Sequence, residues 1–227
     1  MPVILSSGGI DSTVLFYSLA KHPLHHGEDP NEEIVNVVVD FGQVCYAGSV
    51  ANVKYHQQKL GKGRLLTLNV DIPLAPEVAA GPIFDPKYDV EDGREPLESD
   101  YINGRNTILI AQAAALASMY DMLLYVGFHI EKFGDTDRSP DFLAVFTDLQ
   151  YAGGFRKATI RKIVAPFMDA EMDKSAVVDL GFELGVEFDH TNSCTYKHPA
   201  CGKCGICKAR PKWLEEGRLH HEGRHPK

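Results

Sequence analysis

The opening of the chain constrains its fold more than any other stretch. Pro2 to Leu5 is a short apolar run that predicts a buried strand, and Ser6 to Gly9 predicts a tight turn. Residues 11–20 carry apolar side chains at helical spacing, so they predict a helix directly after the turn. A strand that passes through a glycine turn into a helix is typical of parallel sheets, which bind ligands at the carboxyl ends of their strands.

The remainder of the chain repeats this alternation. Further strands are predicted at 34–40, 64–70, 122–128 and 160–164, and further helices at 46–60, 106–120, 139–149 and 173–184. Residues 71–104 contain five prolines and predict a long loop, either a lid or a substrate-facing insertion. The fold class is therefore α/β, with a Rossmann-like parallel sheet covered by helices on both faces. We expect this domain to span 1–190 and a small cysteine-rich tail to span 191–227.

The first turn has the chemistry of an anion site. Its two glycines let the backbone approach an anion, its hydroxyl groups donate hydrogen bonds, and the following helix adds partial positive charge. The turn lacks the lysine of a GxxxxGKS/T loop, and it is not a GxGxxG turn. The alternative is a plain strand–turn–helix corner, in which the serines and the aspartate only cap the helix.

The same residues resemble the SGGxDS loop of the N-type ATP pyrophosphatases, which split ATP into AMP and pyrophosphate. The resemblance implies a core like that of the adenine nucleotide alpha hydrolases, with ATP as a substrate. It implies that Asp11 helps to position Mg²⁺. It also implies that the nucleotide is held by Ser6, Ser7, Gly8, Gly9, Ile10, Asp11, Ser12 and Thr13.

Four of the five cysteines lie close together in the tail, at Cys194, Cys201, Cys204 and Cys207. Four thiolates with two-residue gaps are typical of a tetrahedral Zn²⁺ site without an open position, so we expect a structural zinc. An iron–sulfur cluster is the alternative, because Cys-x2-Cys-x2-Cys also occurs in ferredoxins. A disulfide framework is disfavoured, since the N-terminus does not read as a secretory signal. Cys45 is expected to pack as a small residue and not to act as a nucleophile.

The charge balance argues against a protein that grips nucleic acid. The chain carries 23 Lys and Arg against 31 Asp and Glu, a formal net charge of −8. The tail is locally basic, but thiolates bound to a metal would offset part of that charge. No apolar run of about 18 residues is present, so we expect no membrane partner and a cytoplasmic location.

Motifs along nearly the whole chain narrow the resemblance. In chain order they are Asp40–Gln43 (D-Y/F-G-Q), Tyr101–Asn106 (Y-V-P-G-R-N), Asp137–Phe142 (a shortened D-x-S-G-Y-P-D), Ala165–Lys174 (P-L…K-x-E) and Ser193–Arg210 (S-C…C-G-x-C-x-x-C-x-x-R). Together with the first turn, they resemble the 7-cyano-7-deazaguanine synthases, which are ATP-dependent enzymes of queuosine and related pathways.

This resemblance implies conversion of 7-carboxy-7-deazaguanine and ammonia into the nitrile, by adenylation first of the carboxylate and then of the amide. Such chemistry needs positioning and charge neutralisation more than covalent catalysis. Arg105 would neutralise a phosphate or the substrate carboxylate, and Asp137 and Asp141 would bind the base. The family motifs also imply nucleotide contacts from Asp40, Gly42, Gln43, Gly104, Arg105 and Asn106. A homodimer is allowed.

Departures from the family pattern leave alternatives open. Asn192 stands where the family has Trp, Asn103 stands where it has Pro, and the stretch 135–142 lacks a Gly-Tyr pair. The alternative function is a related ligase that stops at the carboxamide or acts on another carboxylate. Ordinary structural roles also stay open for Arg105, Asp137, Asp141 and His129.

Overall fold

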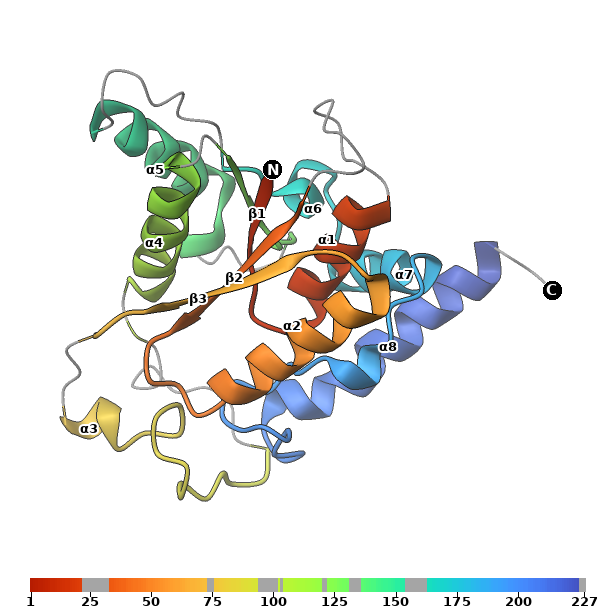
Figure 1. The fold of residues 1–227 in the computed structure, drawn as a ribbon. Helices are drawn as coiled ribbons and strands as arrows, with labels where there is room; N and C mark the ends of the chain where they lie inside the picture. Colours follow the sequence, from red (N-terminus) through yellow and green to blue (C-terminus); the bar gives the residue numbers. More distant parts are fainter. Residues whose placement is uncertain are drawn as a thin grey trace.

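The computed structural model describes residues 1–21, 33–72, 76–93, 102, 104–119, 122–130, 136–153 and 163–224, which form a helix-covered parallel sheet (Figure 1). The strands are β1 (Pro2–Leu5), β2 (Val35–Asp40), β3 (Arg64–Asn69) and β4 (Leu123–Val126), and they pair in the order β3-β2-β1-β4. The predicted α/β class is confirmed. Because the strand order reverses beside β1, the fold has a switch point between β1 and β4, where such sheets bind ligands.

The helices of the described residues include the five that the sequence predicts, with ends within four residues of the predicted ones, and three that it does not predict, α3, α6 and α8. They are α1 (Ile10–Lys21), α2 (Tyr46–Leu60), α3 (Pro76–Ala79), α4 (Arg105–Met119), α5 (Pro140–Gly153), α6 (Pro166–Asp169), α7 (Lys174–Glu183) and α8 (Gly205–Arg224), with 3-10 turns η2 (Thr136–Arg138) and η3 (Phe188–His190). Local chemistry sets two of these ends. α2 ends at Gly61, which adopts a left-handed φ of 61°. α7 begins after Asp173, whose carboxylate accepts the backbone N–H of Ala176.

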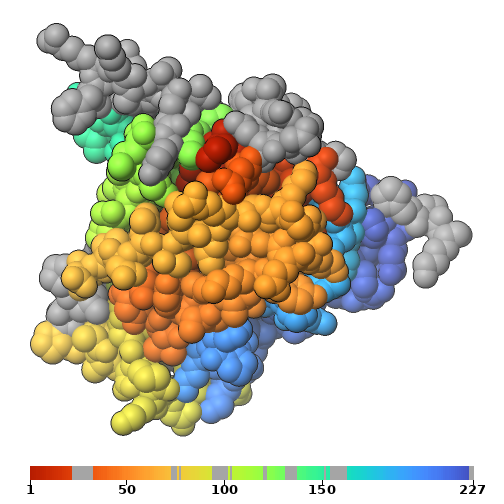
Figure 2. Space-filling view, in the orientation of Figure 1, coloured from red at the N-terminus to blue at the C-terminus, as the bar shows by residue number. Residues whose placement is uncertain are grey.

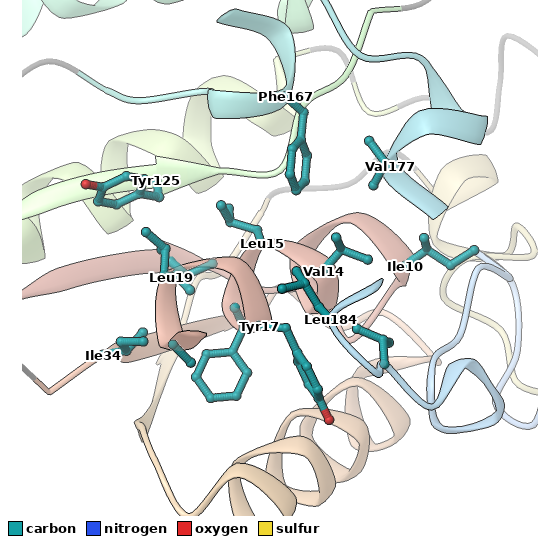
Figure 3. Packing of buried hydrophobic residues seen from close by; sticks show 14 of the residues in the cluster. Ile10, Val14, Leu15, Tyr17, Leu19, Ile34, Tyr125, Phe167, Val177 and Leu184 are labelled. Atoms are coloured by element: carbon teal, nitrogen blue, oxygen red, sulfur yellow. The ribbon is translucent and has the colours of Figure 1, made fainter. Parts of the chain in front are cut away.

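Alternate residues of the strands feed two separate cores, one on each face of the sheet. Val3 of β1 packs among residues of α4 and α5, while its neighbour Ile4 packs among residues of α1 and α7. Figure 3 shows the second of these cores, in which Leu15 and Val14 of α1 lie below the Phe167 side chain, with Tyr125 of β4 to their left and Val177 to their upper right. The apolar sequences of the strands therefore reflect burial on both faces.

Two predicted elements differ from the structure. Of the predicted strand 160–164, residues 160–162 lie outside the described residues, and Val164 makes an isolated parallel bridge to Tyr125. The predicted loop 71–104 is not wholly irregular, because it contains α3. Tyr101 and Asn103 of the Y-V-P-G-R-N motif also lie outside the described residues.

The tail contributes a long helix, α8, which packs along α7 (Figure 1). The two helices approach closely because Gly217 of α8 lies against Val178 of α7, where an added Cβ would stand 2.4 Å from the valine Cγ1. The domain boundary at residue 190 stays a prediction. No helix in the part of the chain that the structure describes is both long and apolar enough to cross a membrane.

Candidate functional site

A cavity of about 320 Å³ opens at the carboxyl ends of β1, β2 and β4, at the switch point of the sheet. The first turn, residues 6–12, forms one wall. The start of α4 and the segment after β4 form others, and residues 192–195, which lead into the cysteine cluster, complete the site. Segments far apart in the sequence therefore meet at one hollow.

The first turn, residues Ser7–Thr13, is called the phosphate loop below. Gly8 has a φ of 66°, and an added Cβ would stand 2.7 Å from the carbonyl oxygen of Ser49, so only glycine fits there. The backbone N–H of Ser7 donates to Ser12 Oγ at 3.2 Å, and that of Gly9 donates to Ser7 Oγ at 3.3 Å. The loop is thus a compact set of hydroxyl and N–H groups at the start of α1.

Asp11 is the acidic group of this site, and it is already paired with a cation. Lys174 Nζ lies 2.7 Å from both carboxylate oxygens, and His129 Nδ1 lies 3.6 Å from one of them. The same ammonium stands over the ring of Trp213, 5.2 Å from its centroid. Trp213 belongs to α8, so this helix adds a cation–π contact to the ion pair. A lysine, a carboxylate and an imidazole therefore converge beside the phosphate loop.

The structure brings some of the predicted site residues to the cavity wall and leaves others elsewhere. The wall includes Ser6, Ser7, Asp11, Ser12, Gln43, Arg105 and Asn106. It does not include Gly8, Gly9, Ile10, Thr13, Asp40, Gly42, Gly104, Asp137 or Asp141. Of these, Ile10 and Thr13 are buried in α1, whereas Asp141 is exposed in the first turn of α5. Gly8 and Gly9 shape the backbone of the phosphate loop, and Ser7 and Ser12 of the same loop line the cavity.

The D-F-G-Q motif forms a self-contained turn after β2. Gln43 Oε1 accepts the backbone N–H of Phe41 at 2.8 Å, and Gln43 Nε2 donates to the carbonyl oxygen of Val39 at 2.8 Å. Asp40 Oδ1 accepts the N–H of Gly42, which has a φ of 86°. These bonds hold the turn so that Phe41 and Gln43 face the cavity.

Sequence reasoning did not assign several residues of the wall. Arg138, at the end of η2, lines the cavity beside the predicted Asp137, and Cys45 lines it from the start of α2. Burial raises the pKa of the Cys45 thiol, which disfavours the thiolate, and its role as a packing residue stays a prediction. Lys174 belongs to one of the family motifs, but no local sequence pattern predicts its contact with Asp11.

The four predicted cysteines lie together. Their Sγ atoms all lie within 4.8 Å of one another, with 3.6 Å between Cys194 and Cys201 and 3.8 Å between Cys201 and Cys207. Four thiolates at tetrahedral corners around Zn²⁺, with Zn–S near 2.3 Å, stand roughly 3.8 Å apart, so the set fits one such ion. A four-iron cluster, in which each thiolate binds a different iron, requires wider spacing.

The described part of the predicted 71–104 loop covers this cluster. Ile83 and Val90 form a small core with Tyr196 and the cysteines, and Gly93 donates to the carbonyl oxygen of Lys203. Figure 2 shows the yellow segment beside the blue cysteine region at the lower edge of the molecule. Residues 81–93 therefore cover the cysteine cluster.

A family model described as Queuosine biosynthesis protein QueC matches residues 1–217. A 7-cyano-7-deazaguanine synthase from Halobacterium salinarum is 29% identical over 214 residues, which is 92% of this chain and 88% of its own length. One from Pyrococcus abyssi is 30% identical over 240 residues, 95% of this chain and 92% of its own length.

Among solved structures, the U34-tRNA thiolase NcsA from Methanococcus maripaludis with its 4Fe–4S cluster matches with a TM-score of 0.48 and 14% identity. The match covers 99% of this chain and 67% of that one. A likeness this distant says nothing about the ligand of the cysteines here.

Proposed function

The chain belongs to the QueC family of queuosine biosynthesis proteins, and we propose that it makes 7-cyano-7-deazaguanine from 7-carboxy-7-deazaguanine, ammonia and ATP. The observation that carries this proposal is the cavity at the switch point. It places the phosphate loop on one wall and Arg105 and Asn106 on another. Its volume of about 320 Å³ lies within the range of small-molecule sites.

ATP would bind with its pyrophosphate at the phosphate loop. The hydroxyls of Ser7 and Ser12 and the N–H groups at the start of α1 are the donors for the phosphate oxygens. Lys174 supplies a positive charge beside them, since its ammonium already lies against Asp11. Asp11 carries the carboxylate that would hold Mg²⁺, an ion that commonly takes one or two carboxylates plus phosphate oxygens.

The substrate carboxylate would attack the α-phosphorus of ATP, forming a mixed anhydride with AMP and releasing pyrophosphate. Ammonia would displace AMP to give the amide, and a second adenylation of the amide oxygen would allow loss of AMP and formation of the nitrile. Arg105 and Arg138 line the cavity from α4 and η2, so we assign them to the substrate carboxylate and the adenylate. These side chains accelerate the reaction by positioning and by neutralising charge.

The base would lie against the apolar wall formed by Phe41, Leu109 and Phe128. We retain Asp137 and Asp141 as proposed partners of its donor edge, although neither lines the cavity in this structure. Asp137 precedes Arg138 in η2, and Arg138 lines the cavity, so η2 is the element that would present Asp137 to the base.

The four cysteines would hold Zn²⁺ as a structural ion. All four ligand positions are thiolates, so the ion would have no open position and would fix the tail.

Product mass spectrometry tests the proposal. Zinc-loaded protein would be incubated with 7-carboxy-7-deazaguanine, ATP, Mg²⁺ and ammonium, with AMP counted in parallel. We expect the nitrile with two AMP per product, and no turnover in Asp11→Asn. Lys203→Ala, which alters an exposed ion pair with Asp89, is the matched control and should match wild type. An amide with one AMP, or no AMP above background, would contradict the proposal.

A further inference from the structure

One residue, Asn192, contacts both the phosphate loop and the cysteine cluster. Its backbone N–H donates to the carbonyl oxygen of Gly8 at 3.0 Å. Its side-chain oxygen accepts the N–H of Cys194 at 3.0 Å, and its Nδ2 donates to the carbonyl oxygens of Cys194 at 3.2 Å and Lys197 at 3.0 Å. The side chain therefore closes the turn that presents the first cysteine, while the backbone holds the phosphate loop.

The bond to Gly8 sets the direction of a peptide group. In a trans peptide the C=O and the following N–H point in opposite directions. Asn192 N–H and Asn52 Nδ2, at 3.0 and 3.2 Å, hold the Gly8 carbonyl on one side. The N–H of Gly9 must then face the other side, where Ser7 Oγ lies 3.3 Å away. Ser7 lines the cavity, so this bond positions a hydroxyl that faces the proposed phosphate site.

The residues that flank Asn192 are tied to the helix that carries the last cysteine. Arg210, about one turn after Cys207 on α8, donates through Nη1 to Ser193 Oγ at 2.8 Å. Its Nη2 donates to Thr191 Oγ1 at 2.8 Å and to the carbonyl oxygen of Phe188 at 2.6 Å. A restraint on the cysteines is therefore transmitted to both sides of Asn192.

We propose that Asn192 is a positioning residue that couples the four-cysteine site to the phosphate loop, so that Zn²⁺ and ATP strengthen each other's binding. The proposal rests on the proposed ATP site. Zn²⁺ at Cys194 restrains the turn that Asn192 closes, and this restraint keeps the Gly9 N–H on Ser7 Oγ, which holds the Ser7 hydroxyl at the phosphate site. Such coupling is reciprocal and typically amounts to about 5- to 150-fold in affinity.

The test measures the affinity of the full chain for Zn²⁺, by competition with a chromophoric chelator, with and without saturating α,β-methylene-ATP and Mg²⁺. We expect the nucleotide to tighten Zn²⁺ binding by about fivefold or more in wild type. In Asn192→Ala the three side-chain bonds are lost but the backbone N–H remains. Zn²⁺ and nucleotide should each still bind. The coupling ratio, which is the Zn²⁺ affinity with nucleotide divided by that without it, should fall to about one.

Two further variants separate coupling from loss of stability. Asn52→Ala removes the other donor to the Gly8 carbonyl, so it should weaken nucleotide binding. At a saturating nucleotide concentration, the ratio of Zn²⁺ affinities with and without nucleotide should stay at the wild-type value. Asn192→Asp keeps the acceptor for the Cys194 N–H and loses both Nδ2 bonds, so it should reduce the ratio even if Asn192→Ala fails to fold. A merely structural Asn192 would lower both affinities and leave the ratio at the wild-type value.

An unchanged ratio in the foldable Asn192 variants overturns the inference, and so does a wild-type ratio of one with nucleotide bound. Nucleotide binding to wild type is measured separately by calorimetry. If α,β-methylene-ATP does not bind at all, the proposed function fails together with the inference, so the two failures are distinguishable.

Discussion

The phosphate loop and the cysteine turn, residues 192–207, lie against each other but are held by different means. The loop is fixed by the fold: Gly8 fits against Ser49 of α2, and buried neighbours accept and donate its hydrogen bonds. The turn is held by a small core with residues 81–93 and carries four clustered cysteines, which would bind the proposed Zn²⁺. The first region is therefore held by packing and hydrogen bonds within the fold, whereas in our proposal the second also needs the free energy of metal binding.

Removing one thiolate should have the largest effect. Cys204 is buried within the cluster, and Cys204→Ser leaves an incomplete ligand set around Zn²⁺. We expect the free energy of unfolding to fall by roughly 5 kcal/mol, with loss of zinc stoichiometry. Thermal unfolding with zinc analysis checks this. Cys45→Ser, which alters the cysteine outside the cluster, should change stability by about 1 kcal/mol at most. Equal effects of the two variants would show that the cluster binds no metal.

A side chain on the phosphate loop should have the next largest effect. Gly8→Ala places a Cβ 2.7 Å from the Ser49 carbonyl oxygen at a φ of 66°, so we expect a loss of about 3 kcal/mol in stability and loss of nucleotide binding. Gly61 has a φ of 61° but no atom within 4 Å of an added Cβ. Gly61→Ala should therefore cost only about 1 kcal/mol. Denaturant titration of both variants measures the difference, and similar losses would mean that the loop is not held by close packing.

Removing the cation beside the loop should affect activity and not stability. Lys174→Ala leaves Asp11 without its ammonium partner and the phosphates without a nearby charge. We expect kcat/KM for ATP to fall by about 100-fold, which is about 2.7 kcal/mol. Steady-state kinetics with AMP detection checks this, and a change below twofold would exclude Lys174 from the nucleotide site.

The smallest predicted effect is on a buried contact outside both regions, which joins α2 to α1 and η3. His56 of α2 is buried between the Tyr17 hydroxyl at 3.0 Å and the carbonyl oxygen of His190 at 3.1 Å, so its Nε2 must carry the proton. Burial lowers the pKa of His56 to about 4, and burial raises the pKa of Tyr17 to about 12.

Above pH 6.5 His56 is neutral in both the folded and the unfolded chain, so it contributes no pH dependence. As the pH falls toward 4, only the unfolded chain takes up the proton, and stability is lost by about 2 kcal/mol at pH 5. Denaturant titrations of wild type and His56→Gln between pH 7.5 and 5 isolate this difference. A wild-type slope that persists in the variant would assign the pH dependence to other groups.

The sequence allowed prediction of whatever a local pattern determines. β1, the phosphate loop and α1 follow from an apolar run, two glycines and helical spacing, and Gly61 and Asp173 mark helix ends by their own conformations. The four cysteines were also recognisable, since their spacing alone lets them converge. The α/β class follows because buried parallel strands are apolar on both faces.

Contacts between distant segments were not predictable in this way. Lys174 and Asp11 are 163 residues apart, and their pairing depends on α7 packing beside α1. Helix α8 was not predicted, because Pro211 and many charged residues obscure its helical pattern, although Gly217 allows it to pack on α7. The role of residues 81–93 as a cover for the cysteines depends on tertiary contacts alone.

The most direct test of the account follows oxygen atoms. 7-Carboxy-7-deazaguanine with both carboxylate oxygens labelled with oxygen-18 would be converted in the presence of ATP, Mg²⁺ and ammonium, and the AMP and phosphate products analysed by mass spectrometry. Two adenylations transfer one labelled oxygen to each of two AMP molecules, so we expect AMP to carry the label and pyrophosphate to carry none. Label in inorganic phosphate, or unlabelled AMP, would contradict adenylation at the phosphate loop.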